Sequence, residues 1–184
     1  MRTAIGTYGG SLKSVAATQL GATVIRESLA RAGLSPEKVQ TVVMGQVLQA
    51  GARMNPARQA AVHAGIPVEV PAMTVNRVCG SGAQAIASAA LEIWTGNLEC
   101  AVAGGMENMD QAPYLELDGR WGHRMGPTTQ QDAMLYDGLN DAFSGEHSGW
   151  HTEDLVAKYN ISRLYATAVY QLAEAIAGRS PEPR

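Results

Sequence analysis

The residues best suited to chemistry lie in one stretch, residues 75–82, with the sequence VNRVCGSG. An apolar run precedes it from Pro71, and a long segment rich in Ala and Ile follows it. This order predicts a strand, a tight turn and a helix, with Cys79 at the turn. The first turn of a helix carries unpaired N–H groups and partial positive charge, so it favours an anion. A cysteine thiolate held there is a nucleophile.

Gly80 and Gly82 support a catalytic role for this turn. They leave no side chain between the sulfur and an incoming group, and their N–H groups can face a developing oxyanion. The alternative is that Cys79 is simply a small buried apolar residue, as many free cysteines are.

Composition limits the classes of protein that this chain can represent. Its 184 residues are 46% hydrophobic and 17% charged, which favours a folded α/β or α-rich protein over a disordered one. A net charge of -3 without a basic stripe argues against nucleic acid, and no apolar run is long enough for a membrane span. Cys79 and Cys100 fit a reduced protein, and the N-terminus lacks a secretory signal, so we expect a cytoplasmic location.

Helices and strands are expected to alternate after a loop over residues 1–15. The expected elements are a helix over 16–32 that stops at Gly33, a strand over 39–48 covered on both faces, a helix from Asn55-Pro56 to Gly65, a strand over 72–76, a helix over 81–94 buried on nearly every side, and a strand over 100–103 that ends at Gly104-Gly105. Such alternation predicts a mixed, mostly parallel sheet with helices on both faces.

Ligands of open α/β sheets collect beyond the carboxyl ends of the strands. Both Cys79 and Gly104-Gly105 follow strands, so they are expected at the same end of the sheet. The glycine pair either allows a turn after its strand or keeps side chains out of the space in front of Cys79, and the two interpretations are compatible.

Residues 110–151 have weak periodicity and suggest an excursion, with a helix near residues 129–139. Thr152 is expected to cap a further helix, and Ser162 to begin a last one. His147 and His151 have the spacing of a helical metal pair, but no further ligand set accompanies them, so no metal site is expected. His147 is either a polar residue whose hydrogen bonds are made within the excursion or a residue that lines a pocket.

Seven short blocks together resemble the N-terminal half of a thiolase, most like the biosynthetic, acetyl-CoA acetyltransferase type. The resemblance extends over residues 2–163. The blocks are VNRVCGSG, MGQV at 44–47, NPARQAA at 55–61, VAGGMENM at 102–109, RMG at 124–126, DGLNDAF at 137–143 and EHSG at 146–149.

The resemblance implies roles for individual residues. Cys79 would be the acyl-thioester nucleophile, with its own backbone N–H in the oxyanion hole. Leu139 and His147 would contact coenzyme A, and Ser148 stands where the family usually has methionine, which bears on the shape of the acyl pocket. Residues 55–59 match a region near the family's dimer interface, and the complete family form is a homodimer or homotetramer.

The same resemblance implies a domain scheme. Residues 1–109 would form an incomplete thiolase α/β core, residues 110–163 an excursion that lines the coenzyme A pocket, and residues 164–184 a divergent helical tail. Family members have an apolar strand, taken as the centre of the sheet, ahead of the Arg-Thr pair, whereas Met1 directly precedes Arg2 here. The family's Gly-His-Pro, Asn-Glu-Ala-Phe and Cys-x-Gly motifs, which belong to its second half, do not occur in this sequence.

The implied activity is the joining of two acetyl-CoA molecules into acetoacetyl-CoA, or the reverse cleavage. Coenzyme A thioesters would be substrates, with no permanently bound cofactor, no nucleic acid and no membrane as partners. Loss of a general base typically costs about 10²–10⁴ in rate, so we expect these residues alone to have little activity. The alternative is a non-catalytic thiolase remnant that binds coenzyme A or a thiolase partner.

Overall fold

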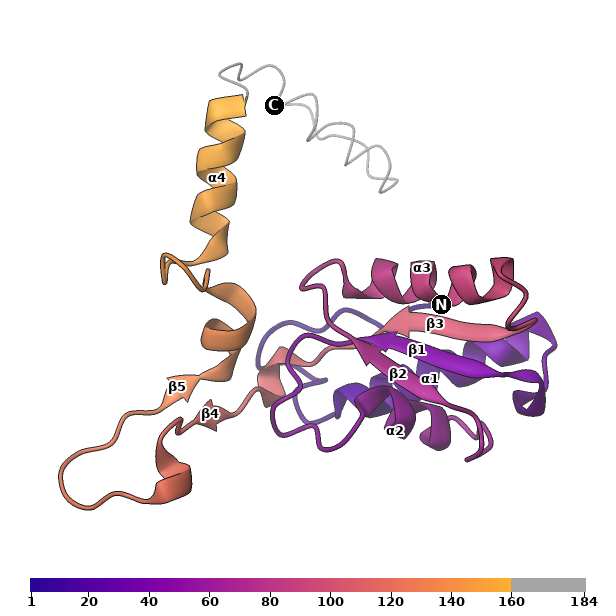
Figure 1. Ribbon diagram of the computed structural model, residues 1–184, viewed down its shortest axis with the longest axis horizontal. Helices are drawn as coiled ribbons and strands as arrows, with labels where there is room; N and C mark the ends of the chain where they lie inside the picture. Colours follow the sequence, from indigo (N-terminus) through magenta and orange to yellow (C-terminus); the bar gives the residue numbers. More distant parts are fainter. Residues whose placement is uncertain (160–184) are drawn as a thin grey trace. The chain divides into compact units, whose positions relative to one another are not determined.

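The computed structural model describes residues 1–159, and Figure 1 shows the ribbon. The chain divides into two compact units, Met1–Gly138 and Leu139–Arg184, and each is considered by itself. The domain scheme expected from the resemblance stays a prediction. Its tail over residues 164–184, and the helix expected from Ser162, lie outside the described residues.

A sheet of three parallel strands forms the centre of the first unit. The strands are β1 (Thr41–Gly45), β2 (Ala72–Val75) and β3 (Ala101–Gly105), in the spatial order β2-β1-β3. The mostly parallel sheet expected from the sequence is confirmed. Among the three described strands, β1 is the middle one.

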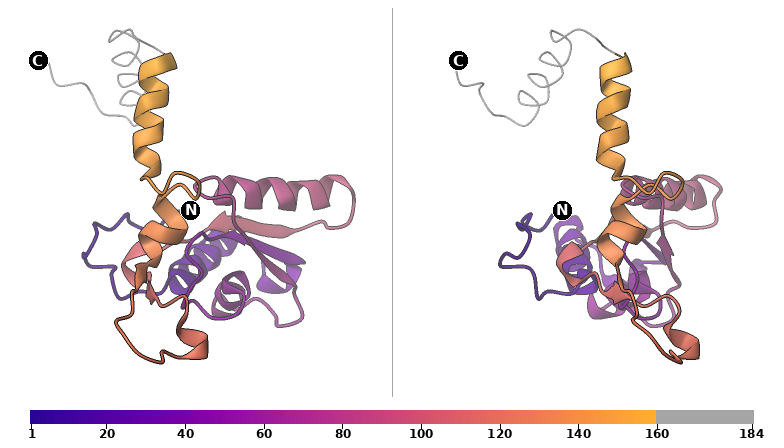
Figure 2. Two further views of the ribbon diagram at one scale, coloured as in Figure 1. Left: turned by 60° about the vertical axis from the view of Figure 1, so that its left-hand side comes forward. Right: turned by 90° about the vertical axis from the view of Figure 1, so that its left-hand side faces the viewer.

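Helices cover both faces of this sheet, as Figures 1 and 2 show. α1 (Ala17–Ala32) and α2 (Pro56–His63) pack on one face, and α3 (Ser81–Trp94) packs on the other. The predicted bounds of α1 and α3 are confirmed. α1 stops where expected, because Gly33 takes a left-handed φ of 62° that most other residues avoid.

Alternation along β1 divides the core between the two faces. Val42 and Met44 pack among the side chains of α1 and α2, whereas Val43 packs against Ala85 and Ala89 of α3. Successive strand residues point to opposite faces, so the continuous apolar run of β1 supplies both cores.

α2 is tied to the sheet at its first turn. The Asn55 side chain accepts from the Arg58 N–H at 3.2 Å and donates to the Ala72 carbonyl at 2.9 Å, so one side chain caps the helix and fastens it to β2. The predicted alanine face is also confirmed. It consists of buried Ala57, Ala60, Ala61 and Ala64.

The expectation that α3 is buried on nearly every side is wrong. Only Ser81, Ala85 and Ala89 are buried, whereas Ile86, Leu91 and Trp94 are 58%, 55% and 80% exposed. The helix lies on the sheet with one face and leaves an apolar outer face uncovered. Apolar composition alone does not reveal how many sides of a helix have neighbours.

The rest of the first unit consists of short elements. They are 3-10 turns over Pro36–Lys38, Met109–Gln111 and Gly119–Trp121, the antiparallel pair β4 (Tyr114–Leu115) and β5 (Gln131–Asp132), and a π-helical turn over Met134–Leu139 that ends in the second unit. The helix expected over 129–139 is thus wrong in its first half. The Asp132 carboxylate accepts from the Met134 N–H at 2.9 Å, which starts the turn only after β5.

The second unit contains α4 (Ser148–Tyr159). The expectation that Thr152 caps this helix is wrong, because Thr152 lies inside it and its hydroxyl donates to the Ser148 carbonyl at 3.1 Å. Among the described residues, no helix combines the length and the apolar character that crossing a membrane requires.

Gly45 makes a contact that no larger residue can make. A Cβ there would lie 2.5 Å from the Ser81 carbonyl carbon and 2.7 Å from the Gly82 nitrogen, both backbone atoms. We expect Gly45→Ala to lower the free energy of unfolding by about 1–3 kcal/mol, because α3 must move off the sheet. Urea denaturation measures this change.

Gly104→Ala is the matched control, because its Cβ would meet only the end of the Met44 side chain, Sδ at 3.5 Å and Cε at 3.6 Å, which are ordinary contacts. It should change stability by much less. Equal losses from the two substitutions would show that the contact between Gly45 and α3 is unimportant.

Candidate active site

Cys79 lies in an exposed turn between β2 and α3. The alternative that it is a buried apolar residue is therefore wrong. Both cysteines are free, as expected. The helix behind the turn begins at Ser81, with Gly80 as its cap and no acidic residue in its first turn. A helix start of this kind favours a nearby negative charge, and Cys79 directly precedes its cap, Gly80.

The end of the sheet holds this helix start closely. A Cβ on Gly105 would lie 3.3 Å from the Gly82 Cα, which is tighter than most real Cβ contacts. Gly104-Gly105 and the cysteine turn thus lie at the same end of the sheet, as the sequence predicts. Gly104-Gly105 does more than allow a turn after its strand, because the missing side chain of Gly105 lets the start of α3 approach the end of β3.

A compact hydrogen-bond network holds the turn. The Ser81 hydroxyl accepts from the Arg77 N–H at 2.8 Å and donates to the Val78 carbonyl at 2.6 Å. The Val78 N–H donates to the Asn76 side chain at 2.9 Å, and the Gly80 N–H donates to the Arg77 carbonyl at 3.0 Å. These bonds make no use of the Cys79 N–H.

Val78 has a backbone conformation that is unusual for its type. Its φ of 47° lies in the left-handed region, which a β-branched residue rarely adopts. Strain of this kind persists only where surrounding contacts impose it, and it is common at functional sites. Here the Ser81 and Asn76 bonds impose it and turn Cys79 outward. Sequence reasoning missed Asn76 and Ser81, although short polar residues on either side of a turn are a known signal for side-chain bonds to the backbone.

The second unit contains the other residues that the sequence predicts for the site. Leu139 ends the π-helical turn, and His147 and Ser148 lie together at the start of α4. His147 Nδ1 accepts from the Gly149 N–H at 3.1 Å, so the histidine caps α4. Because Nδ1 is an acceptor, the neutral ring carries its proton on Nε2, and that atom can donate to a ligand.

Cys79 belongs to the first unit, whereas Leu139, His147 and Ser148 belong to the second. His147 and His151 do not form a metal pair. His151 Nε2 lies 2.8 Å from the Ser144 hydroxyl, and the described residues contain no group of three or more metal-binding side chains.

Residues 55–59, expected near a dimer interface, make several bonds within the chain. The Arg58 guanidinium donates to the carbonyl groups of Val68 and Val70, and the Gln59 amide donates to the Ala52 carbonyl at 2.7 Å. A role at a dimer interface stays a prediction.

Comparison with known proteins decides the family. A family model for the thiolase N-terminal domain matches residues 1–176. The chain belongs to the thiolase family. It is 51% identical over 162 residues to an acetyl-CoA acetyltransferase of Cupriavidus necator, and 49% identical over 162 residues to probable acetyl-CoA acyltransferases of Staphylococcus epidermidis and Staphylococcus aureus. Each match covers 88% of this chain, and the chain spans 41% of each relative's length.

In this thiolase chain, Glu107 of the VAGGMENM block supports the loop after β1. Its carboxylate accepts from the Val47 N–H at 2.8 Å and from the Leu48 N–H at 3.3 Å. Burial raises the pKa of Glu107 above its ordinary 4.5, and the two backbone donors oppose this effect.

The strain at Val78 can be tested with glycine, which adopts a positive φ without cost. The change in the free energy of unfolding caused by Val78→Gly should be more stabilising, or less destabilising, than the change caused by Val68→Gly, by about 1 kcal/mol. Val68 is the control because it is similarly exposed, lies in a turn and lacks a positive φ. Urea denaturation compares them, and equal effects would contradict strain at Val78.

The raised pKa of Glu107 predicts a pH dependence of stability. Burial disfavours the charged form of the Glu107 carboxylate in the folded chain. The contribution of Glu107 to the free energy of unfolding is therefore most favourable below pH 4.5, and it is lost as the pH rises through the raised pKa of the folded state. Glu107→Gln removes this titration. The free energy of unfolding of the wild type should fall relative to that of the variant as pH rises from below 4.5 towards neutrality.

The measurement is urea denaturation across that pH series. Glu69→Gln is the control, because Glu69 is exposed. Identical pH profiles for the two variants would contradict the assignment to Glu107.

Proposed function

We propose that this chain carries the nucleophile of an acetyl-CoA acetyltransferase, with Cys79 in that role. The observation that carries the proposal is an exposed cysteine held outward at a helix start by a strained, hydrogen-bonded turn, in a thiolase chain. The relatives named above as acetyl-CoA acetyltransferase and probable acetyl-CoA acyltransferases support the substrate class.

The first step is an acyl exchange at sulfur. The Cys79 thiolate attacks the thioester carbonyl carbon of acetyl-CoA, and a new sulfur–carbon bond forms. The bond from the carbonyl carbon to the coenzyme A sulfur breaks, and coenzyme A leaves as a thiolate that takes a proton from solvent. The Cys79 N–H, which is not used in the turn, is suited to stabilise the oxyanion formed on the way.

In the second step a second acetyl-CoA loses a proton from its methyl carbon to a base that the family carries in its second half, and the resulting carbanion attacks the carbonyl carbon of the acetyl-Cys79 thioester. A carbon–carbon bond forms, the bond from the carbonyl carbon to the Cys79 sulfur breaks, Cys79 leaves as a thiolate, and acetoacetyl-CoA results; the reverse sequence cleaves that product. Leu139, His147 and Ser148 are proposed to contact coenzyme A, with His147 Nε2 as a hydrogen-bond donor. Coenzyme A thioesters are substrates in this scheme, and no permanently bound cofactor takes part. The cytoplasmic location and a homodimer or homotetramer stay predictions.

Residues 1–184 alone are proposed to turn over slowly. Within the first unit, no side chain makes a hydrogen bond to the Cys79 sulfur, so no general base contacts the nucleophile there. Loss of a general base typically costs about 10²–10⁴ in rate.

One observation favours a second candidate function, the binding of a thiolase partner without catalysis. The outer face of α3 exposes Ile86, Leu91 and Trp94. Contiguous exposed apolar surface of this kind marks sites of protein association.

Mass spectrometry after incubation with acetyl-CoA tests the first step. We expect an acetyl group to appear faster on Cys79 than on Cys100, because Cys79 is exposed at a helix start whereas Cys100 is half-buried. Cys79→Ala should remove this label and leave slow labelling of Cys100. Equal, slow labelling of both cysteines would contradict the proposed nucleophile.

Addition of the C-terminal half of the Cupriavidus necator relative separates the two functions. Recovered cleavage of acetoacetyl-CoA, lost in Cys79→Ala, supports catalysis. Association of the two halves without turnover supports the binding function.

A further inference from the structure

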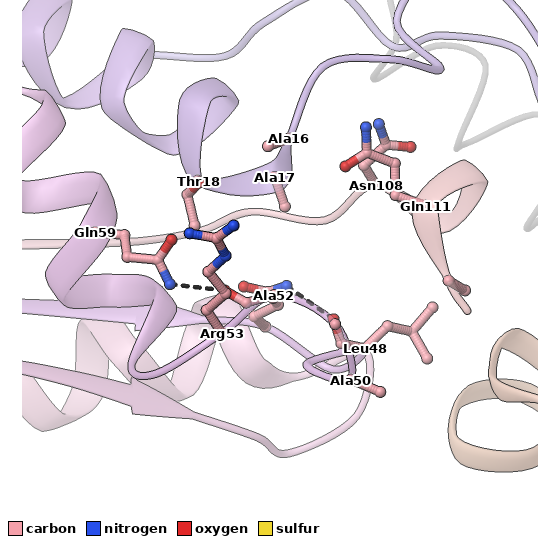
Figure 3. A pocket seen from close by; sticks show the side chains of 13 residues that line it. Ala16, Ala17, Thr18, Leu48, Ala50, Ala52, Arg53, Gln59, Asn108 and Gln111 are labelled. Atoms are coloured by element: carbon pink, nitrogen blue, oxygen red, sulfur yellow. Dashed lines mark hydrogen bonds between the residues drawn. The ribbon is translucent and has the colours of Figure 1, made fainter. Parts of the chain in front are cut away.

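A pocket separate from the cysteine turn lies in the first unit (Figure 3). It is enclosed by the start of α1, the loop after β1 and the segment around Asn108. Its volume is about 170 Å³, room for about five or six waters at ~30 Å³ each. This space suits a small ligand and is far too small for coenzyme A.

Gln46 provides an unused acceptor in this pocket. The residue is only 3% exposed, and its Nε2 donates to the Leu48 carbonyl at 2.8 Å, which fixes the orientation of the amide. Within residues 1–159, Gln46 Oε1 has no hydrogen-bond donor. Buried polar atoms are nearly always hydrogen-bonded, so we expect this oxygen to accept a hydrogen bond from an O–H or N–H of a ligand.

The start of α1 provides unused donors in the same pocket. Ala16 caps the helix and offers no side-chain acceptor. The first bonds to the cap come from Gln19 and Leu20, so in the described chain the N–H groups of Ala17 and Thr18 have no acceptor. The 16-residue helix also places partial positive charge here.

Arg53 is the only ionisable side chain among the residues that line the pocket. In Figure 3 its guanidinium extends from its loop towards Thr18 at the start of α1. In the described part of the chain it makes no hydrogen bond and no ion pair. Arg53 gives the lining a positive charge, which favours an anion, while the Glu107 carboxylate next to the pocket is occupied by the Val47 and Leu48 N–H groups.

We propose that this pocket binds a protonated phosphate group. Its oxygens would accept from the Arg53 guanidinium and from the N–H groups of Ala17 and Thr18, and its remaining hydroxyl would donate to Gln46 Oε1. An anion without a proton, such as sulfate, would meet the same cationic groups and would leave Gln46 without a donor. The ligand is inorganic phosphate or the end of a small phosphate monoester.

Thermal unfolding of the whole chain in inorganic phosphate and in sulfate tests the proposal. Near neutral pH phosphate retains at least one proton and sulfate retains none. We expect phosphate to raise Tm at a concentration at least tenfold lower than sulfate. Amide NMR should show shifts of the Ala17 and Thr18 N–H signals and of the Gln46 side-chain NH₂ signal.

Arg53→Met should abolish the phosphate effect, whereas Arg120→Met, at an exposed arginine outside the pocket, should retain it. Gln46→Met keeps the volume and removes the acceptor, so it should erase the preference for phosphate over sulfate. If this buried variant does not fold, the sulfate comparison in the wild type still tests Gln46.

Equal stabilisation by both anions that persists in Arg53→Met would be a general salt effect and would overturn the proposal. Absence of any effect would also overturn it. Glycerol phosphate distinguishes the two sources of the group when both ligands are compared below about pH 6, where a phosphate monoester keeps a proton. Binding of inorganic phosphate alone assigns free phosphate, and equal or tighter binding of glycerol phosphate assigns a monoester. Both of these outcomes support the site, and neither bears on Cys79.

Discussion

The close approach of α3 to the sheet is the constraint on which the cysteine turn depends. At the end of β1 a Cβ on Gly45 would lie 2.5 Å from the Ser81 carbonyl carbon, and at the end of β3 a Cβ on Gly105 would lie 3.3 Å from the Gly82 Cα. Three backbones meet here without side chains between them. Contact between backbones leaves the helix start little freedom to move, because backbone atoms cannot change rotamer. The position of Cys79 follows from that contact.

Two side chains of the segment after β3, Glu107 and Asn108, hold two loops near the cysteine turn in place. Glu107 accepts from the N–H groups of the loop after β1, and the Asn108 amide donates to the carbonyl groups of Leu12 at 3.0 Å and Val15 at 2.7 Å. Two neighbouring side chains thus hold two loops that are distant in the sequence. The loop after β1 and Asn108 itself line the pocket that contains Arg53, so the polar residues of the VAGGMENM block support the fold around the cysteine turn and around this pocket.

The residues predicted for the active site belong to both units of the chain. The proposed nucleophile, Cys79, lies at a closely packed helix start, which suits a group that must present one atom to a substrate. The proposed coenzyme A contacts lie around a helix cap, where the His147 ring uses Nδ1 for the fold and keeps Nε2 for a ligand. The outer face of α3 exposes apolar side chains of Ile86, Leu91 and Trp94.

The sequence by itself determined the order of the elements, the bounds of α1 and α3, the position of Cys79 at a strand-to-helix turn and the family. These depend on local patterns, namely periodicity, caps such as Asn55, stops such as Gly33, and short motifs. The uncovered face of α3, the late start of the turn after β5 and the cap at His147 were decided only by the tertiary structure. So were the strain at Val78, the unpaired oxygen of Gln46 within the described residues and the direction of the Arg53 side chain. The uncovered face of α3 and the surroundings of Gln46 and Arg53 depend on which distant residues meet. The strain at Val78, the late turn after β5 and the cap at His147 depend on short side-chain bonds to the backbone, and an apolar pattern does not specify their geometry.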